Sequence, residues 1–133
     1  LILLGVIIMH EVSMAQGIIN TVLETAENNG ATEVNKIYIE VGKLAMLNPE
    51  QLKFLLDVLV ENTMAENAKI DILEVPVTIS CPECGYEGVA NLDDSDHYAP
   101  IIECPKCENL RISILGGRDC IVKNIIVEKP DEE

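Results

Sequence analysis

The sequence predicts an α+β fold in which two helices pack on a small three-stranded β-sheet, with an inserted four-cysteine lobe of the zinc-ribbon type. Two segments repeat apolar residues at helical spacing, and four further regions have the composition of strands. Two Cys-x-x-Cys pairs lie between the last strand regions. An amphipathic helix pair must cover a sheet that has one apolar face. The length of 133 residues is that of one domain, or of one domain with a small satellite.

The first helix is predicted from Val12 to Ala26, where the apolar residues form one stripe. Asn28-Asn29-Gly30 ends this helix, because Gly30 can adopt the left-handed conformation of a helix cap. A strand follows at Lys36–Gly42. Its strict alternation predicts that one face is covered, and the residues of that face are Ile37, Ile39 and Val41.

The second helix is predicted to begin at Asn48-Pro49-Glu50-Gln51. Asn48 can accept hydrogen bonds from the free amides, and Pro49 lies where no amide donor is needed. Gln51 can reach back to the start of the helix as in a capping box. The leucines that follow form a buried stripe, which comprises Leu52, Leu55, Leu56 and Leu59.

Three more strand regions are predicted at Ile70–Ile79, Arg111–Leu115 and Cys120–Glu128. Pro76 interrupts the first region, because proline cannot donate to a strand ladder. The residues Gly116-Gly117 separate the other two regions. We expect the cysteine insert to protrude as a separate lobe between these strands.

The cysteine insert contains the pairs Cys81/Cys84 and Cys104/Cys107, separated by 19 residues. Two-residue spacing lets both thiolates of a pair face one ion, and two such turns produce a tetrahedral four-sulfur site. This spacing predicts a structural Zn(II) site that orders a segment too poor in apolar residues to fold alone. Such a closed site stabilises the fold and does not catalyse a reaction.

Two other uses of the cysteine pairs are weaker. A redox Cys-x-x-Cys is not favoured, because there are two matched pairs and no thioredoxin-like context. Iron is the better rival, since tetrahedral sulfur also binds iron. Iron would need dry, aromatic cover, and only Tyr86 and Tyr98 lie nearby in the sequence. Cys120 lies in an apolar run, which favours a buried small hydrophobic residue over a ligand.

The charge of the chain restricts its partners. With 9 basic and 23 acidic residues, the formal net charge is −14. This balance disfavours nucleic acids and anionic membrane surfaces, and it suits metal ions or a basic protein face. The apolar block Leu1–Ile8 is too short to span a membrane, and it lacks the preceding positive charge and the cleavage site of a secretory signal. We therefore interpret the protein as cytoplasmic.

The two histidines are weak signals when considered alone. His10 lies beside Glu11 at the start of a predicted helix, where a histidine is usually a capping or surface residue. His97 ends the acidic segment Asp93–His97 between the cysteine pairs, which favours a solvated loop.

From Met9 to about Lys129 the chain resembles the HypA/HybF family of hydrogenase nickel-incorporation proteins. The resemblance rests on a combination of motifs rather than on the cysteines alone. They are Met9-His10-Glu11-Val12-Ser13, Ile37-x-Ile39-x-Val41-Gly42-x-Leu44, the Pro76 strand entering Cys81-Pro82-x-Cys84, Cys104-Pro105-x-Cys107 and Gly117-Arg118-Asp119. The sequence departs from the family pattern at Asp119, where many members have Glu, and at Cys120, where a larger apolar residue is expected.

The resemblance implies a nickel metallochaperone. Such a protein binds transferable Ni(II) at its amino terminus and delivers it, with a HypB-like GTPase, to the large subunit of [NiFe]-hydrogenase, and in some organisms to urease. The implied nickel residues are His10, Met9 through its terminal amine, and Glu11 close by. His97 is a further candidate contact. The implied division is a nickel-binding domain at 9–79 plus 111–129, a zinc-binding insert at 80–110 and a charged tail at 130–133.

A chelate at the amino terminus requires Met9 to be the first residue. A peptide bond at that point replaces a basic amine with an amide nitrogen that hardly binds metal. We therefore interpret Leu1–Ile8 as an upstream start extension. The alternative is that this block forms an apolar strand or handle.

Three function classes follow from these patterns. The first is a nickel carrier, which would be a binding protein. We do not expect an enzyme, since the sequence shows no nucleophile–base constellation and no phosphate-binding glycine loop. A zinc-ribbon adaptor in transcription or translation is the second, and a rubredoxin-like iron electron carrier is the third. For the nickel carrier we expect a monomer or a weak dimer.

Overall fold

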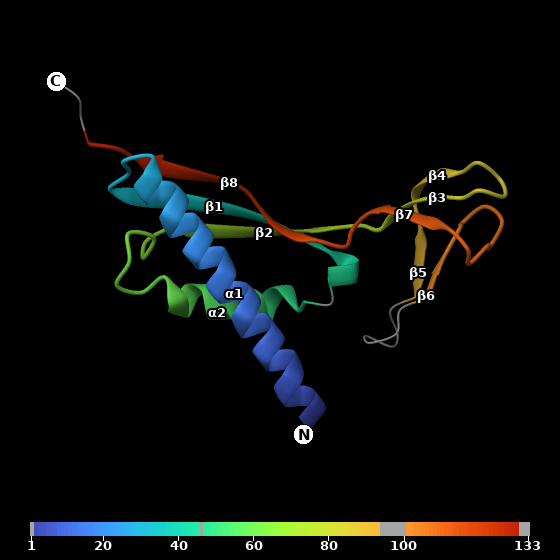
Figure 1. The fold of residues 1–133 in the computed structure, drawn as a ribbon, viewed down its shortest axis with the longest axis horizontal. Coiled ribbons are helices and arrows are strands. Elements are labelled where there is room, and N and C mark those ends of the chain that lie inside the picture. Colours follow the sequence, from blue (N-terminus) through green and yellow to red (C-terminus); the bar gives the residue numbers. More distant parts are fainter. Residues whose placement is uncertain (1, 46, 94–100, 131–133) are drawn as a thin grey trace. The chain divides into compact units, whose positions relative to one another are not determined.

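Figure 1 shows the computed structural model, which describes residues 2–45, 47–93 and 101–130, with the backbone alone for residues 2–10. The chain divides into two compact units. The helical unit comprises Leu1–Glu40, Leu47–Leu73 and Ile121–Glu133, and the cysteine unit comprises Val41–Met46 and Glu74–Cys120. The domain boundaries given above stay predictions.

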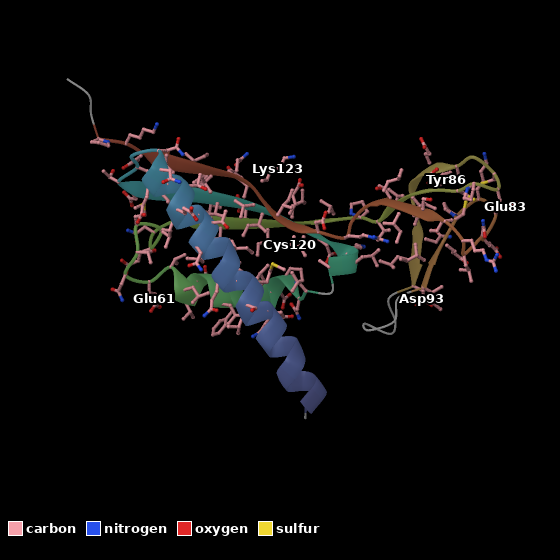
Figure 2. All side chains as sticks on the ribbon, viewed as in Figure 1. Glu61, Glu83, Tyr86, Asp93, Cys120 and Lys123 are labelled. Carbon is pink, nitrogen blue, oxygen red and sulfur yellow. The ribbon has the colours of Figure 1, made fainter. Side chains whose placement is uncertain are left out.

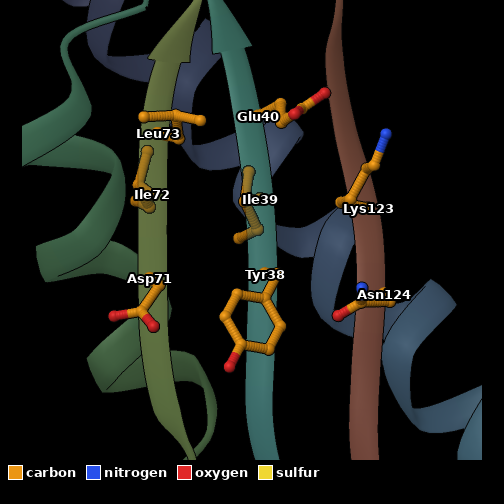
Figure 3. A pocket seen from close by; sticks show the side chains of 8 residues that line it. All are labelled: Tyr38, Ile39, Glu40, Asp71, Ile72, Leu73, Lys123 and Asn124. Carbon is orange, nitrogen blue, oxygen red and sulfur yellow. The ribbon is translucent and has the colours of Figure 1, made fainter.

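The helical unit is built on a three-stranded sheet. Its order is β2 (Lys69–Val75), β1 (Glu33–Gly42) and β8 (Cys120–Glu128), and it packs with helices α1 (Ile2–Asn28) and α2 (Pro49–Leu59). The alternation predicted for β1 is confirmed, because Ile37, Ile39 and Val41 are all buried. Figure 3 shows both helices behind the sheet, on the face opposite Tyr38. The predicted arrangement of two helices on one side of a small sheet is therefore confirmed.

The other face of this sheet is open. It carries a shallow groove of about 340 Å³ across all three strands, and side chains that line it include Tyr38, Asp71, Leu73 and Lys123 (Figure 3). Acidic, basic and apolar side chains alternate along the groove, so it has no single chemical character.

Helix α1 follows the predicted apolar stripe. The residues that it buries against the rest of the unit are Ala15, Ile18, Ile19, Val22 and Ala26. Its end also agrees with the prediction, because Gly30 has a φ of 70°. Gly30 N donates to Glu27 O and Ala31 N donates to Ala26 O, which is the paired hydrogen bonding of a Schellman motif.

The start of α1 differs from the prediction, since the helical backbone extends back to Ile2 rather than to Val12. The alternative of an apolar strand at Leu1–Ile8 is therefore wrong for the described part of that block. Short apolar runs are ambiguous between helix and strand. Here the run continues an existing helix, and adding residues to a helix avoids the cost of nucleating a new one.

Helix α2 begins as predicted. The Asn48 side chain accepts hydrogen bonds from Glu50 N at 3.0 Å and from Gln51 N at 3.2 Å, and Pro49 occupies the first turn. The predicted leucine stripe is confirmed for Leu52 and Leu56, which are fully buried. Its outer members, Leu55 and Leu59, are only half-buried.

Pro76 divides the predicted strand Ile70–Ile79 between two sheets. Strand β2 ends at Val75, and β3 (Thr78–Ser80) belongs to the cysteine unit. There β3 pairs antiparallel with β4 (Glu87–Val89) and with β7 (Ser113–Gly116). A hairpin of β5 (Asn91–Asp93) and β6 (Ile101–Glu103) completes this unit, together with the short helix η1 (Lys43–Ala45). Strands β4, β5 and β6 have three residues each, too few for alternation to reveal them.

Two backbone segments of the cysteine unit approach each other closely. Gly42 N donates to Asp119 O and Leu44 N donates to Gly117 O, both at 2.8 Å. A Cβ atom at Gly42 would collide with the backbone atoms C and O of Gly117. Gly117 itself has a φ of 95°, which L-residues with side chains rarely adopt. The motif that contains Gly42 and the motif that begins with Gly117 thus meet backbone to backbone. This close approach requires glycine at both positions.

We expect Gly42→Ala to destabilise the protein by about 3 kcal/mol, because the new methyl group collides with backbone that cannot rotate away. Urea unfolding followed by circular dichroism measures this change. Gly17→Ala is the matched control, since nothing lies within 4 Å of a Cβ at this helical position. The control should gain roughly 0.5–1 kcal/mol. Equal stability of the Gly42 variant and the parent would contradict the close approach.

Candidate metal centre

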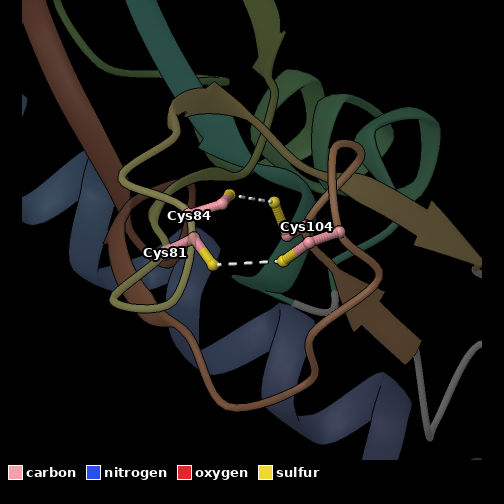
Figure 4. A group of neighbouring side chains, drawn as sticks. Cys81, Cys84 and Cys104 are labelled. Carbon is pink, nitrogen blue, oxygen red and sulfur yellow. Dashed lines mark hydrogen bonds between the residues drawn. The ribbon is translucent and has the colours of Figure 1, made fainter.

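Four cysteine sulfurs converge in the cysteine unit (Figure 4). Cys81 follows β3 and Cys104 follows β6, and each begins a turn that carries the second cysteine of its pair. The four Sγ atoms all lie within 4.8 Å of one another. The Sγ atoms of Cys81 and Cys107 are 3.5 Å apart, and those of Cys84 and Cys104 are 3.6 Å apart.

These distances suit one zinc ion. Four sulfurs at the usual zinc–sulfur distance of about 2.3 Å form a tetrahedron with edges of roughly 3.8 Å. Two edges are already close to this value, so small side-chain movements suffice to complete the tetrahedron. The set is made only of thiols, which leaves no open position for a substrate, as in structural zinc sites.

The two cysteine turns have the same backbone hydrogen bonds. The bonds in the first turn are Cys81 N to Tyr86 O at 2.8 Å and Gly85 N to Cys81 O at 2.9 Å, and those in the second are Cys104 N to Asn109 O at 3.1 Å and Glu108 N to Cys104 O at 2.9 Å. The fifth residue of each turn is left-handed, with a φ of 77° at Gly85 and 63° at Glu108. Glu108 therefore carries a backbone strain of roughly 1–2 kcal/mol that Gly85 avoids.

The sulfurs differ strongly in their acidity. The Cys84 backbone amide, with further help from the Glu83 amide, lowers the pKa of Cys81 to about 6 despite burial. The Asn109 amide also lowers the pKa of Cys107, but burial and the neighbouring sulfurs outweigh it and raise this pKa to about 12. One thiolate therefore forms readily, and further ionisation is opposed by like charge. A divalent cation bound among the sulfurs would offset this repulsion and favour ionisation of the remaining thiols.

Two further groups contact the sulfurs from outside the set. The Asn109 side chain donates to Cys81 Sγ at 3.9 Å and to Arg111 O at 3.2 Å. Lys106 N donates to Cys104 Sγ at 3.4 Å. Groups of this kind orient metal ligands. The sequence prediction missed Asn109, although an Asn that closes a cysteine turn is a recognisable source of such hydrogen bonds.

Cys120 lies at the start of β8 and does not belong to the four-sulfur set (Figure 2). Its side chain is half-buried, so the prediction of a buried residue is only partly right. Burial raises the pKa of its thiol, which keeps the thiol protonated and poorly reactive at neutral pH.

The amino-terminal candidates lie in helix α1. The backbone at Met9 and His10 is helical, whereas the side chains of these two residues and the whole of His97 lie outside what the structure describes. Glu11 is described and is only 3% exposed. Its Oε1 accepts a hydrogen bond from Asn48 N at 3.1 Å. Glu11 thus takes the place predicted for Gln51 at the start of α2, and it fixes residue 11 against that helix.

The sequence model of one protein family, described as "Hydrogenase/urease nickel incorporation, metallochaperone, hypA", matches residues 9–127 of this chain. The chain belongs to this family. The match begins at Met9 and spans both the residues before α2 and the four cysteines. The resemblance to the HypA family and the predicted class, a nickel metallochaperone, are therefore confirmed.

Two relatives in the HypA family are similar along their whole length. The hydrogenase maturation factor HypA of Methanobrevibacter smithii is 69% identical over 125 residues, which covers 94% of this chain and 100% of the relative. The hydrogenase maturation factor HypA of Methanothermobacter thermautotrophicus is 51% identical over 123 residues, which covers 92% of this chain and 100% of the relative. Neither an adaptor nor an iron electron carrier is favoured by these relatives.

Two solved structures have the same fold. The solution structure of the Ni metallochaperone HypA from Helicobacter pylori superposes with a TM-score of 0.63 and 18% identity, covering 90% of this chain and 98% of that one. A second solution structure of a HypA protein has a TM-score of 0.63 and 20% identity, covering 90% of this chain and 96% of that one. The α+β fold with its four-cysteine cluster is therefore confirmed.

We expect Glu11→Ala to destabilise the protein by about 1 kcal/mol, because Asn48 N loses the acceptor of a partly buried hydrogen bond. Glu11→Gln keeps a side-chain oxygen in place and should recover at least half of the loss. Urea unfolding of the helical unit, followed by circular dichroism, measures both. Two variants with the stability of the parent would show that the hydrogen bond contributes nothing.

Zinc content should depend on pH in the acid range. The thiolate of Cys81, whose pKa is lowered to about 6, is present above this value and is lost as the pH falls through it. Protons already compete with zinc at neutral pH for Cys107, whose pKa is raised to about 12. Protonation of Cys81 below about pH 6 adds to this competition and favours release of the ion. Dialysis against a pH series followed by metal analysis measures the release. Cys120→Ser should give the same curve, whereas a zinc content unchanged from about pH 7 to about pH 3 would contradict thiolate ligation.

Proposed function

We propose that this chain carries Ni(II) to the large subunit of a [NiFe]-hydrogenase during maturation of that enzyme. Membership of the HypA family is the observation that supports this most directly, since the family is described by nickel incorporation. The same description names urease, which is the alternative recipient. The chain acts in this proposal as a binding protein and not as an enzyme.

The proposed nickel residues are Met9, His10 and Glu11. Ni(II) favours nitrogen donors in square-planar or tetragonal arrangements. The α-amine of Met9, the next backbone amide and the His10 imidazole supply three nitrogens at neighbouring positions. A free α-amine titrates near pH ~8, so a divalent ion competes successfully with its proton. The matched region of the family begins at Met9, which supports a working amino terminus at that residue.

Two further assignments complete the metal chemistry. We propose that Cys81, Cys84, Cys104 and Cys107 hold a resident structural Zn(II), supported by the four converging sulfurs. His97 is proposed as an additional nickel contact, which His97→Ala tests through the nickel affinity.

The partners follow from the chemistry that this chain lacks and from its charge. Delivery is proposed to require a HypB-like GTPase, since the sequence has no glycine loop of its own for a nucleotide phosphate. The charge of −14 supports a basic protein partner and opposes nucleic acid and anionic membranes.

Within the described residues, neither helix combines the length and hydropathy that a membrane span needs. Two Cys-x-x-Cys pairs that suit a metal ion better than disulfides support a cytoplasmic location. A monomer or weak dimer is proposed.

We expect a chain that begins at Met9 to bind one Ni(II) in addition to its zinc, with an affinity at least tenfold above that of His10→Ala. The imidazole is one of only three proposed nitrogen donors, and its loss opens the chelate. Isothermal titration with Ni(II) into zinc-loaded protein measures both affinities.

The chain that retains Leu1–Ile8 is the matched control. Its Met9 nitrogen is an amide, so it should bind Ni(II) more weakly than the chain that begins at Met9. The carrier assignment fails if the trimmed protein takes up no Ni(II), or if His10→Ala leaves the uptake unchanged.

A further inference from the structure

Helix α2 presents an apolar pair on its outward face. Phe54 is 62% exposed, and Val58, one helical turn later, is 48% exposed. Phe54 is the only Phe in a chain that has no Trp. Aromatic side chains contribute most per residue to cores and are enriched at protein interfaces. A chain with so few aromatic residues that leaves its one Phe outside the core has this side chain available for a partner.

Acidic side chains surround this pair. Glu50 precedes Phe54 by four residues and Asp57 follows it by three, so both lie beside it on the helix. Glu61 follows Val58 by three residues, just beyond the end of α2 (Figure 2). All three acidic residues are exposed, and Lys53 pairs with Asp57 at 3.0 Å. The α2 face, defined as Glu50, Phe54, Asp57, Val58 and Glu61, therefore has an apolar centre and an acidic rim.

This face lies close to the proposed nickel residues. The Glu11 carboxylate holds Asn48 N at the start of α2, which places residue 11 beside that helix end. Phe54 is six residues further along, or about 9 Å at a rise of about 1.5 Å per residue. A partner seated on the α2 face would thus contact the helix whose first turn is held by Glu11, the residue that directly follows His10.

We propose that the α2 face is the docking surface for the maturation GTPase, through an apolar recess with a rim of Lys and Arg on that partner. The proposal rests on the nickel-delivery function given above. Charge complementarity selects a basic partner, because a second copy of this chain would place one acidic rim against another. The face is one side of an 11-residue helix, roughly 16 Å long, so by itself it offers only a small contact. A carrier that must leave its partner after delivery needs such an interface.

The test uses the purified HypB-like GTPase of the same organism as the probe. Binding of the zinc-loaded chain is measured by biolayer interferometry for the parent, Phe54→Ser and Leu73→Ser. Leu73 is the matched control, since it is 61% exposed but lies on the open face of the sheet. Phe54→Ser should weaken binding at least tenfold, as the loss of a central aromatic contact does. Leu73→Ser should change binding by less than twofold.

Charge reversal provides an independent arm. Glu61→Lys should slow association and flatten its dependence on salt, because the acidic rim steers a basic partner. Unchanged binding by Phe54→Ser, equal losses in Phe54→Ser and Leu73→Ser, or no binding of the GTPase by the parent would each overturn the proposal. A parent dimer that Phe54→Ser dissolves would assign the face to a second copy and would also overturn it.

Nickel titration of the same proteins separates this proposal from the proposed function. Phe54→Ser should retain the nickel affinity of the parent, since its side chain is not a proposed ligand. If the parent takes up no nickel, the carrier function has failed. If nickel binds normally but Phe54→Ser leaves GTPase binding intact, only the docking surface has failed.

Discussion

A cation among four sulfurs is the constraint on which the cysteine unit depends. Thiols within 4.8 Å of one another cannot all ionise unless positive charge lies between them. The buried cluster of the described part of this unit is small and consists of Val77, Ile79, Cys81, Ala90 and Cys104. Two of these five residues are zinc-ligand candidates, so a bound ion would be part of the core. Partly buried hydrophobic residues pack against this cluster, and they are Leu44, Tyr86, Leu92, Ile102, Ile112 and Ile114. A core of this size gains much of its stability from such a metal link.

The helical unit is stabilised differently. Its core is aliphatic and needs no ion, and Glu11 is the one charged residue that it buries among the described residues. Burial of a carboxylate is unfavourable without a partner. The amide of Asn48 and the positive end of α2 offset this cost. The buried Glu11 carboxylate thus links helix α1, directly after His10, to the start of helix α2. An alanine at position 11 could not form this link.

Local signals in the sequence predicted most of the fold. The alternation of Ile37, Ile39 and Val41, the cap at Asn48 and the break at Pro76 are properties of neighbouring residues, and the structure contains all three. The four-cysteine cluster was also predictable, because metal chemistry fixes the spacing within each pair. The acceptor for Asn48 N was not, since Glu11 lies 37 residues away and the local candidate, Gln51, was equally suitable. Contacts of this range depend on how α1 and α2 pack, which no local pattern encodes.

The two metals require opposite properties from their sites. A closed set of four sulfurs holds zinc without an open position, so the ion cannot be handed to a partner. The proposed chelate of two chain-end nitrogens and one imidazole would be open on the remaining side, and a planar arrangement of nitrogens would suit nickel better than tetrahedral zinc. In this proposal the anchored Glu11 and the helical backbone of Met9 and His10 leave little of the chain to order when the ion binds. Loading then involves little conformational entropy, and the ion stays where a partner on the adjacent helix can reach it.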